Sequence, residues 1–306
     1  MLIRKSWIVF VQAIILSLES IIVEFLTAIP GISSLIITGT SIPIAGATLL
    51  FISRIIVNNK ITIFRSWKLV LVGSLFLAAA VFTWYDSVSR VGASKEGILA
   101  GPLETVIVLI FAWFLLKEKL RRLQLVGVVI ALIGFFFAVS SGSLNFNSAL
   151  PFSITFGDFE AIVSAFAFAA GVIVMTKLVE THSPLEVTGA SLLISGLILS
   201  GFAIATSTFY LKIRDWAFLI SFSLVPLLAA LLYVIGLSRI GASLTSTIAS
   251  SNILLTILLQ LIFREFGIRA ILPENIPLAV LGATMGIFGI YIIHVENNIL
   301  FRRKVQ

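Results

Sequence analysis

The chain has 306 residues, of which 59% are hydrophobic and only 11% are charged, and its mean hydropathy is +1.15. Soluble domains carry about 25% charged residues, and a single soluble core stops growing near roughly 250–300 residues. This composition therefore excludes a soluble globular protein. The chain has no cysteine, which excludes disulfides, thiolate metal sites and cysteine nucleophiles. The sequence predicts a polytopic membrane protein.

Ten apolar segments are long enough to cross a bilayer, which takes about 20 apolar residues as a helix. Glu19 and Glu24 interrupt the first segment and no small-residue cleavage site follows it, so it is interpreted as an uncleaved span. We therefore predict an all-α membrane protein with ten transmembrane helices. The segments are 7–28, 33–56, 69–88, 94–116, 123–140, 157–179, 185–208, 216–237, 243–263 and 276–295.

The positions of Lys and Arg predict the orientation of these spans. With the N-terminus in the cytoplasm, 15 of the 21 Lys and Arg residues fall on the inner side, and cytoplasmic loops carry such an excess. The pattern predicts a multi-pass cell-membrane protein with both termini cytoplasmic. It also explains the net charge of +7 by topology and contact with anionic lipid. The lipid bilayer is therefore an expected partner and nucleic acid is not.

An internal repeat divides the chain. The segment 87–94 (SVSRVGAS) recurs 149 residues later as 236–243 (GLSRIGAS), with five of eight positions identical. Each copy joins two spans, the third to the fourth and the eighth to the ninth, so each half has five spans. Because five is odd, the second half must insert inverted relative to the first, which is a transporter architecture. We expect repeats at 1–140 and 157–306, joined by a polar extracytoplasmic linker at 141–156.

Small residues recur at matching positions in the two halves. Such stripes let another helix backbone approach closely, and they can equally face a second copy of the chain, so a homodimer is an open alternative. The predicted packing residues are Gly97, Gly101, Ser246 and Ser250 in the fourth and ninth spans, and Gly127, Gly134, Gly282 and Gly289 in the fifth and tenth.

Over essentially its whole length the chain resembles the EamA-type transporters of the drug/metabolite transporter superfamily. The resemblance is carried by the Gly92-Ala-Ser opening and Pro102 of the fourth span, by its exit at 113–118 (WFLLKE), and by Gly127 and Gly134. The second half is similar through Gly157-Asp158 and the stretch 241–251, although no proline there matches Pro102. The resemblance implies ten helices in two repeats, and export or exchange of small metabolites, with amino acids as the first guess.

Ionisable side chains inside a span are functional candidates because burying them is costly. Glu104 lies mid-span, two residues after Pro102, which can bend the helix, and the repeat offset places Asn252 at the equivalent depth. We expect Glu104 and Asn252 to contact the substrate or a proton; the alternative is a protonated Glu104 bonded to a neighbouring helix. Glu19 is the second candidate, with Gln12 nearly two turns earlier on the same face.

Other polar and aromatic residues have structural alternatives. Glu24 is expected at the wet rim of the bundle, and Gln260 in a hydrogen bond between helices. Trp84 and Tyr85 either line the cavity or mark the membrane interface, where such rings gather. Tyr233 matches Trp84 at the repeat offset and can pair with it as an aromatic wall.

Together these features predict a secondary transporter that works by alternating access between the two repeats on a small-molecule substrate. The alternatives are a passive channel or facilitator and, less favoured, an intramembrane enzyme, for which no converging set of catalytic groups is found. No P-loop, zinc motif or nucleotide fingerprint occurs, so no cofactor and no metal are expected.

Overall fold

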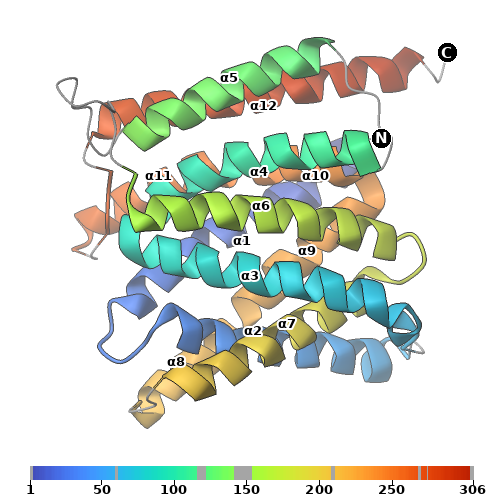
Figure 1. Cartoon of the computed structure of the whole chain (residues 1–306), viewed down its shortest axis with the longest axis vertical. Helices are drawn as coiled ribbons and strands as arrows, with labels where there is room; N and C mark the ends of the chain where they lie inside the picture. The colour runs from blue at the N-terminus through green and yellow to red at the C-terminus, as the bar shows by residue number, and fades with distance from the viewer. Residues whose placement is uncertain are drawn as a thin grey trace.

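The computed structural model describes residues 3–58, 61–115, 122–140, 154–207, 211–267, 270–273 and 275–303. Residues 141–153 of the predicted linker and residues 116–118 of the fourth span's exit lie outside these ranges. The described elements are helical and are stacked with their long axes running between two ends of the bundle (Figure 1). The α-helices are α1 (Ile3–Thr27), α2 (Ser34–Phe51), α3 (Trp67–Val91), α4 (Ala93–Leu115), α5 (Arg122–Ser140), α6 (Phe156–Leu178), α7 (Pro184–Thr206), α8 (Ile213–Phe222), α9 (Leu224–Ile240), α10 (Ala242–Ala249), α11 (Asn252–Glu265) and α12 (Ile276–Arg303).

Ten membrane-crossing units follow from these helices. Within the described residues, eight helical stretches are long and apolar enough to cross a bilayer, and shorter apolar stretches lie in α5 and α12. The spans predicted at 216–237 and 243–263 are each broken: α8 and α9 meet at Ser223, and α10 and α11 meet at Ser250 and Ser251. The all-α, ten-helix prediction is confirmed, and only the continuity of these two spans was wrong.

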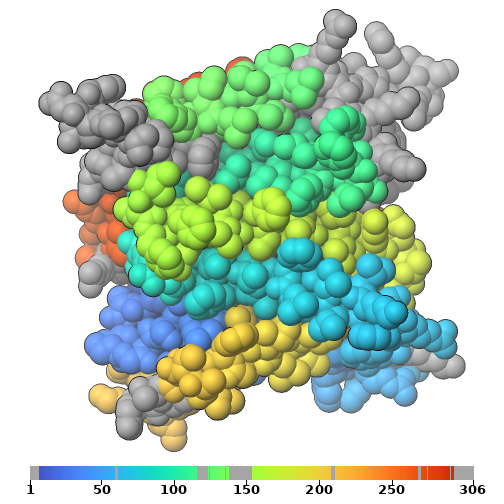
Figure 2. Space-filling view, viewed as in Figure 1, coloured from blue at the N-terminus to red at the C-terminus, as the bar shows by residue number. Residues whose placement is uncertain are grey.

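The outer surface of the bundle is apolar, as a surface that faces lipid requires. The band of α3 crosses the middle of the face shown in Figure 2 and carries a run of exposed apolar side chains. A soluble monomer rarely exposes a continuous apolar surface of this kind. The exposed residues of α3 are Trp67, Leu69, Leu71, Val72, Leu75 and Phe76.

Helices α2 and α7 hold equivalent positions in the two repeats and begin in the same way. The Ser33 hydroxyl accepts a hydrogen bond from the Ile36 amide, and the Ser183 hydroxyl accepts one from the Glu186 amide, both at 3.3 Å. A serine in this position satisfies one of the free amides of the first helical turn. The two serines are 150 residues apart.

The contacts between α2 and α7 have two-fold symmetry. A Cβ on Gly46 would lie 2.2 Å from the Leu193 nitrogen, and a Cβ on Gly196 would lie 2.3 Å from the Pro43 nitrogen. The residues of the two contacts correspond at the repeat offset: Gly196 lies 150 residues after Gly46, and Leu193 lies 150 residues after Pro43. The two backbones can approach this closely only where the side chain is a hydrogen atom. The two repeats are therefore related by inversion across this crossing.

Helices α5 and α12 cross in the same symmetric way and lie side by side at the top of Figure 1. A Cβ on Gly134 would lie 2.7 Å from the Gly282 oxygen, and a Cβ on Gly289 would lie 2.5 Å from the Gly127 oxygen. The residues of these two contacts also correspond: Gly289 lies 155 residues after Gly134, and Gly282 lies 155 residues after Gly127. The four glycines singled out in the fifth and tenth spans therefore meet at one helix crossing.

The third contact between the repeats lies where α4 meets the break between α10 and α11. The Ser250 hydroxyl donates to the Gly101 carbonyl at 3.3 Å, and it contacts the Thr105 hydroxyl at 2.8 Å. Gly101 and Ser250 are separated by the repeat offset of 149, so this contact lies near the pseudo-two-fold axis. Gly97 differs from the expectation: a Cβ there would have no heavy atom within 4 Å, because Gly97 faces a cavity and not a packed helix.

The glycine crossings generate a stability prediction. Gly196→Ala places a methyl group against the Pro43 backbone, so the helices must separate, and overpacking of this kind costs about 1–3 kcal/mol. We expect Gly196→Ala to lower the melting temperature of the purified protein in detergent, measured by tryptophan fluorescence. Gly201→Ala in the same helix is the control, because no heavy atom lies within 4 Å of its added Cβ and alanine favours helix. Equal stability of the two variants would show that α2 and α7 are not close-packed.

Candidate functional site

A cavity of about 130 Å³ lies between the two repeats. For scale, an engineered apolar cavity of about 150 Å³ binds benzene. Both repeats supply its walls, from α1, α2, α3 and α4 in the first half and from α6, α7, α9, α10 and α11 in the second. The location between inverted repeats is where transporters of this architecture bind their substrates.

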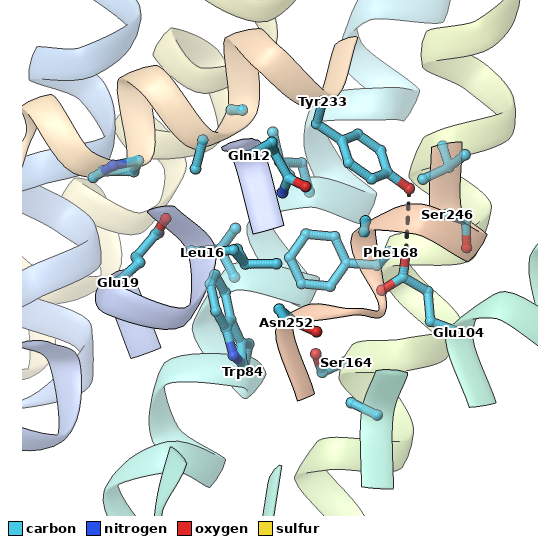
Figure 3. Close-up of a pocket in the computed structure, with 18 of the residues that line it drawn as sticks. Gln12, Leu16, Glu19, Trp84, Glu104, Ser164, Phe168, Tyr233, Ser246 and Asn252 are labelled. Carbon is cyan, nitrogen blue, oxygen red and sulfur yellow. Dashed lines mark hydrogen bonds between the residues drawn. The ribbon is translucent and has the colours of Figure 1, made fainter. Parts of the chain in front are cut away.

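Glu104 projects from α4 into this cavity. Its carboxylate accepts a hydrogen bond from the Tyr233 hydroxyl of α9 at 3.3 Å, which is the dashed line in Figure 3. The helix α4 runs through Pro102 without interruption. The break lies instead at the equivalent place in the second repeat, where Ser250 donates to the Ser246 carbonyl. A serine hydroxyl that bonds back to the preceding turn weakens a helix there.

Glu19 lines the cavity from α1, together with Gln12 on the same face. The Glu19 carboxylate accepts a hydrogen bond of 2.6 Å from the Tyr85 hydroxyl of α3. Tyr85 is fully buried behind Glu19 and is not part of the cavity wall. Its position corrects both alternatives considered for it, since it marks neither the interface nor the cavity but holds a cavity carboxylate.

Asn252 also lines the cavity, at the first turn of α11. The Ser17 hydroxyl of α1 donates to its backbone oxygen at 3.1 Å, which ties α1 to the α10–α11 break. Glu104 and Asn252 therefore share one cavity, but the hydrogen-bond partner of Glu104 is Tyr233.

Aromatic rings form part of the cavity wall. Trp84 is buried and packs edge-on against Phe168 of α6, with the ring centroids 5.8 Å apart. Tyr233 lines the cavity from α9, and Figure 3 shows the Phe168 ring among the labelled polar groups. Trp84 is thus a cavity residue and not an interfacial one, and the second ring of its wall is Phe168, which sequence reasoning missed.

Glu96 is a third cavity carboxylate that sequence reasoning missed. It is 3% exposed, bonds to the Trp84 side chain and lines the cavity from the first turn of α4. Its spacing was a usable signal: Glu96, Ala100 and Glu104 follow one another every fourth residue and so share one helix face. Within the described residues, no group of three or more His, Asp or Glu side chains is arranged to hold a metal ion.

Glu24 lies beyond Glu19 along α1 and is buried, not at a wet rim as expected. Its carboxylate accepts hydrogen bonds from the Ala93 amide at 2.9 Å, from the Gln260 amide group at 2.5 Å, and from the Ile271 amide. Gln260 also accepts from the Ser94 amide at 3.1 Å, so it makes the interhelical hydrogen bonds expected of it. One carboxylate thus joins α1, the start of α4, α11 and the segment after it.

Ion pairs join the repeats at this same end of the bundle. Lys95 contacts Asp158 at 2.7 Å, and both side chains are almost entirely buried. Asp158 also accepts a hydrogen bond from the Thr155 amide at 2.9 Å and so forms part of the cap of α6. Arg90 contacts Asp86 at 2.8 Å and Glu160 at 3.0 Å. Every one of these basic groups therefore has an acidic partner.

The equivalent turns at the two ends of the bundle differ. Gly92 and Gly241 end α3 and α9 with φ of +86° and +82°, a backbone conformation that favours glycine. A Cβ on Gly92 would lie 2.2 Å from the Ile271 oxygen, whereas one on Gly241 would have nothing within 4 Å. The turn after α3 is packed against the rest of the protein and the turn after α9 is open.

The other end has a separate link between the repeats. His182 contacts the hydroxyls of Thr62 at 3.2 Å and Ser66 at 3.0 Å, and Glu186 accepts from the Thr62 amide at 2.9 Å. These contacts join the connection before α3 to the connection before α7. They do not involve the open turn at Gly241.

The apolar helices define a multi-pass membrane protein, and comparisons with known proteins give its family. The sequence profile of the EamA-like transporter family matches residues 5–140 and 155–295. The chain belongs to the EamA-like transporter family.

Two similar proteins add detail. Over 200 residues the chain is 30% identical to the uncharacterized inner membrane transporter YicL of Salmonella typhimurium; the match covers 63% of this chain and 62% of that protein. A protein of known crystal structure aligns over 97% of both chains with a TM-score of 0.68 and 18% sequence identity. The latter likeness shows the fold alone.

The Lys95–Asp158 pair gives a second stability prediction. Lys95→Met leaves the Asp158 carboxylate buried without its ion-pair partner, and breaking one half of a buried pair costs about 3–5 kcal/mol. We expect a large drop in melting temperature in detergent, and recovery of most of it when Asp158→Leu is added. Arg239→Met, at an exposed arginine, is the matched control. A Lys95→Met variant as stable as this control would contradict a structural role for the pair.

Proposed function

We propose that the protein is a secondary transporter that exports or exchanges a small metabolite by alternating access, with the cavity between the repeats as its binding site. The observation that carries the proposal is the two-fold symmetry of the inter-repeat contacts around a cavity that contains carboxylates. Because the two halves have near-equivalent structures, they can exchange conformations and open the same site to either side. Glu104, Glu19, Asn252, Trp84, Tyr233 and Gln12 are the proposed substrate or proton contacts, with Tyr85 positioning Glu19.

The proposed location is the cell membrane, with both termini cytoplasmic. The excess of Lys and Arg on one side supports this orientation, as does the arrangement in which the start of α1 and the end of α12 lie at the same end of the bundle (Figure 1). The Glu24 and Lys95–Asp158 contacts then lie on the extracytoplasmic side. A state with this side held closed and the Gly241 turn open is one half of an alternating cycle.

Two other functions use the same fold and are separated by experiment. A channel or facilitator shares the cavity but has no obligatory conformational cycle. An intramembrane enzyme needs a converging acid, base or nucleophile, whereas the cavity carboxylates bond to Tyr85, Trp84 and Tyr233. A homodimer remains compatible with transport, because each chain contains a whole cavity.

Counterflow tests the transport mechanism. Purified protein in liposomes preloaded with one unlabelled solute is exposed to a trace of the same labelled solute, using a panel of the twenty amino acids and simple amines. We expect several-fold stimulation of uptake by internal solute for at least one member of the panel, because a carrier returns faster when loaded. Uptake that never responds to internal solute would indicate an open pore. Protein-free liposomes and a heat-denatured sample are the controls.

Transport is expected to depend on pH through Glu104. Protonation removes the charge of the Glu104 carboxylate. A neutral Glu104 lowers the free-energy cost of the intermediate in which the cavity is closed to water on both sides. The ionisable groups that share its cavity are Glu96, Glu19 and Tyr233. Glu104→Gln removes a charge-assisted interaction, so we expect the transport rate to fall about tenfold or more and its pH profile to flatten. Wild-type rates across the pH range in this variant would remove Glu104 from the mechanism.

A further inference from the structure

The charged side chains that line the cavity all carry the same sign. Glu19, Glu96 and Glu104 contribute three carboxyl groups, and none of the described residues that line the cavity is Lys, Arg or His. Glu96 and Glu104 lie about 12 Å apart along α4, two turns of the helix, and Glu19 faces the same space from α1. An occupant of this cavity meets acidic groups from two helices.

Two basic residues beside the start of α4 have acidic partners outside the cavity. Lys95 precedes Glu96 in the chain, but its ammonium contacts Asp158 of α6 at 2.7 Å, and Lys95 is not among the described residues that line the cavity. Arg90 is paired with Asp86 and Glu160. Both bases are thus engaged by acids outside the cavity, and no Lys, Arg or His is among the described residues that line it.

The partners of the cavity carboxylates are neutral hydrogen-bond donors. Glu19 accepts from the Tyr85 phenol at 2.6 Å, Glu104 accepts from the Tyr233 phenol at 3.3 Å, and Glu96 bonds to Trp84. A neutral donor orients a carboxylate but does not cancel its charge. A carboxyl group in an apolar setting either takes up a proton or gains an opposite charge beside it. Among the described residues that line this cavity no Lys, Arg or His supplies that charge, whereas a cationic occupant would.

The remaining walls are apolar and aromatic. Trp84 and Phe168 stand edge to face, and Leu16, Leu77 and Val81 lie close by. An ammonium group is attracted to the face of an aromatic ring, while a hydrocarbon body is accommodated by the aliphatic side chains. The volume of about 130 Å³ limits that body to about one ring.

We propose that the cavity selects a small organic cation, namely an amine that carries one apolar or aromatic group and no free carboxylate. The inference rests on the proposed function and names its substrate class. An amino acid has the same ammonium but adds a carboxylate, which would enter an acidic cavity without a cationic partner. The anionic analogue has only the unfavourable group. The expected order of affinity is therefore amine, then zwitterion, then anion.

Three compounds of almost the same shape test this order: phenethylamine, phenylalanine and 3-phenylpropionate. The purified protein in detergent is titrated with each at pH 7, and binding is measured both by thermal stabilisation and by isothermal titration calorimetry. We expect phenethylamine to bind at least tenfold more tightly than phenylalanine, and 3-phenylpropionate not to bind. Equal or tighter binding of phenylalanine would overturn the proposal.

Variants identify the groups responsible. Glu104→Gln and Glu96→Gln each keep the shape of the side chain and remove its charge, so each should weaken phenethylamine binding about tenfold. Glu180→Gln changes an exposed carboxylate between α6 and α7 and is the matched control, with unchanged affinity. Phenethylamine affinity that is the same in all three variants would show that the amine binds outside the cavity and would overturn the assignment.

Binding and counterflow separate this proposal from the proposed function. Trans-stimulation by phenylalanine but not by phenethylamine would leave a carrier in place and overturn the cation assignment. Tight, Glu104-dependent binding of phenethylamine with uptake that ignores internal solute would support the site and overturn the carrier mechanism.

Discussion

The structure depends on the close approach of helix backbones at a few glycines. Lipid tails are as apolar as leucine side chains, so helices in a bilayer gain little from burying apolar surface against one another, and close packing must supply the attraction. At the Gly46–Leu193 and Gly196–Pro43 contacts, α2 and α7 meet with no room for a methyl group. The crossing of α5 and α12 repeats the arrangement. These crossings clamp the two repeats at opposite edges of the bundle and leave the space between them for the cavity.

The fold was largely accessible from the sequence. The length of the apolar segments predicted the ten spans, and the repeated segments 87–94 and 236–243 predicted that the second half is inverted relative to the first. A second copy was missed: Thr38-Gly39 through Gly46 recurs 150 residues later as Thr188-Gly189 through Gly196, and it forms the α2–α7 crossing. The helix breaks at Ser223 and Ser250 were not predicted, because hydropathy averages over about 20 residues and does not register a local competition for backbone hydrogen bonds.

The site was less accessible because its meaning depends on contacts between distant segments. Glu104 and Glu19 could be selected on burial cost alone. Glu24 has the same residue type and a similar position in the same span, yet its three donors come from 93, 260 and 271, and no local pattern predicts that convergence. Glu96 was missed for a related reason. It follows Lys95 at the start of a span, where charged residues usually lie at the membrane surface, and only the structure shows that the two side chains diverge.

The distribution of charge links these observations. Where α3 meets α4, Arg90 and Lys95 are paired with acidic side chains, and the pairs with Glu160 and Asp158 cross the repeat boundary. This end of the bundle is therefore held by contacts that are made within the protein. Among the described residues that line the cavity, the acids have neutral donors and no base. Breaking a buried ion pair is expensive and exchanging one neutral hydrogen bond is cheap, so the first region is suited to hold a conformation and the second to accept a ligand.

The packed turn at Gly92 and the open turn at Gly241 extend this contrast along the bundle axis. The backbones of Gly92 and Gly241 have nearly the same φ, so the difference between the two turns lies in what each one packs against. Two helices connect the cavity to the end of the bundle where α3 meets α4. Helix α4 carries Lys95 at its start and both Glu96 and Glu104 on its cavity face, and α1 carries Glu19 in the cavity and Glu24 beyond it.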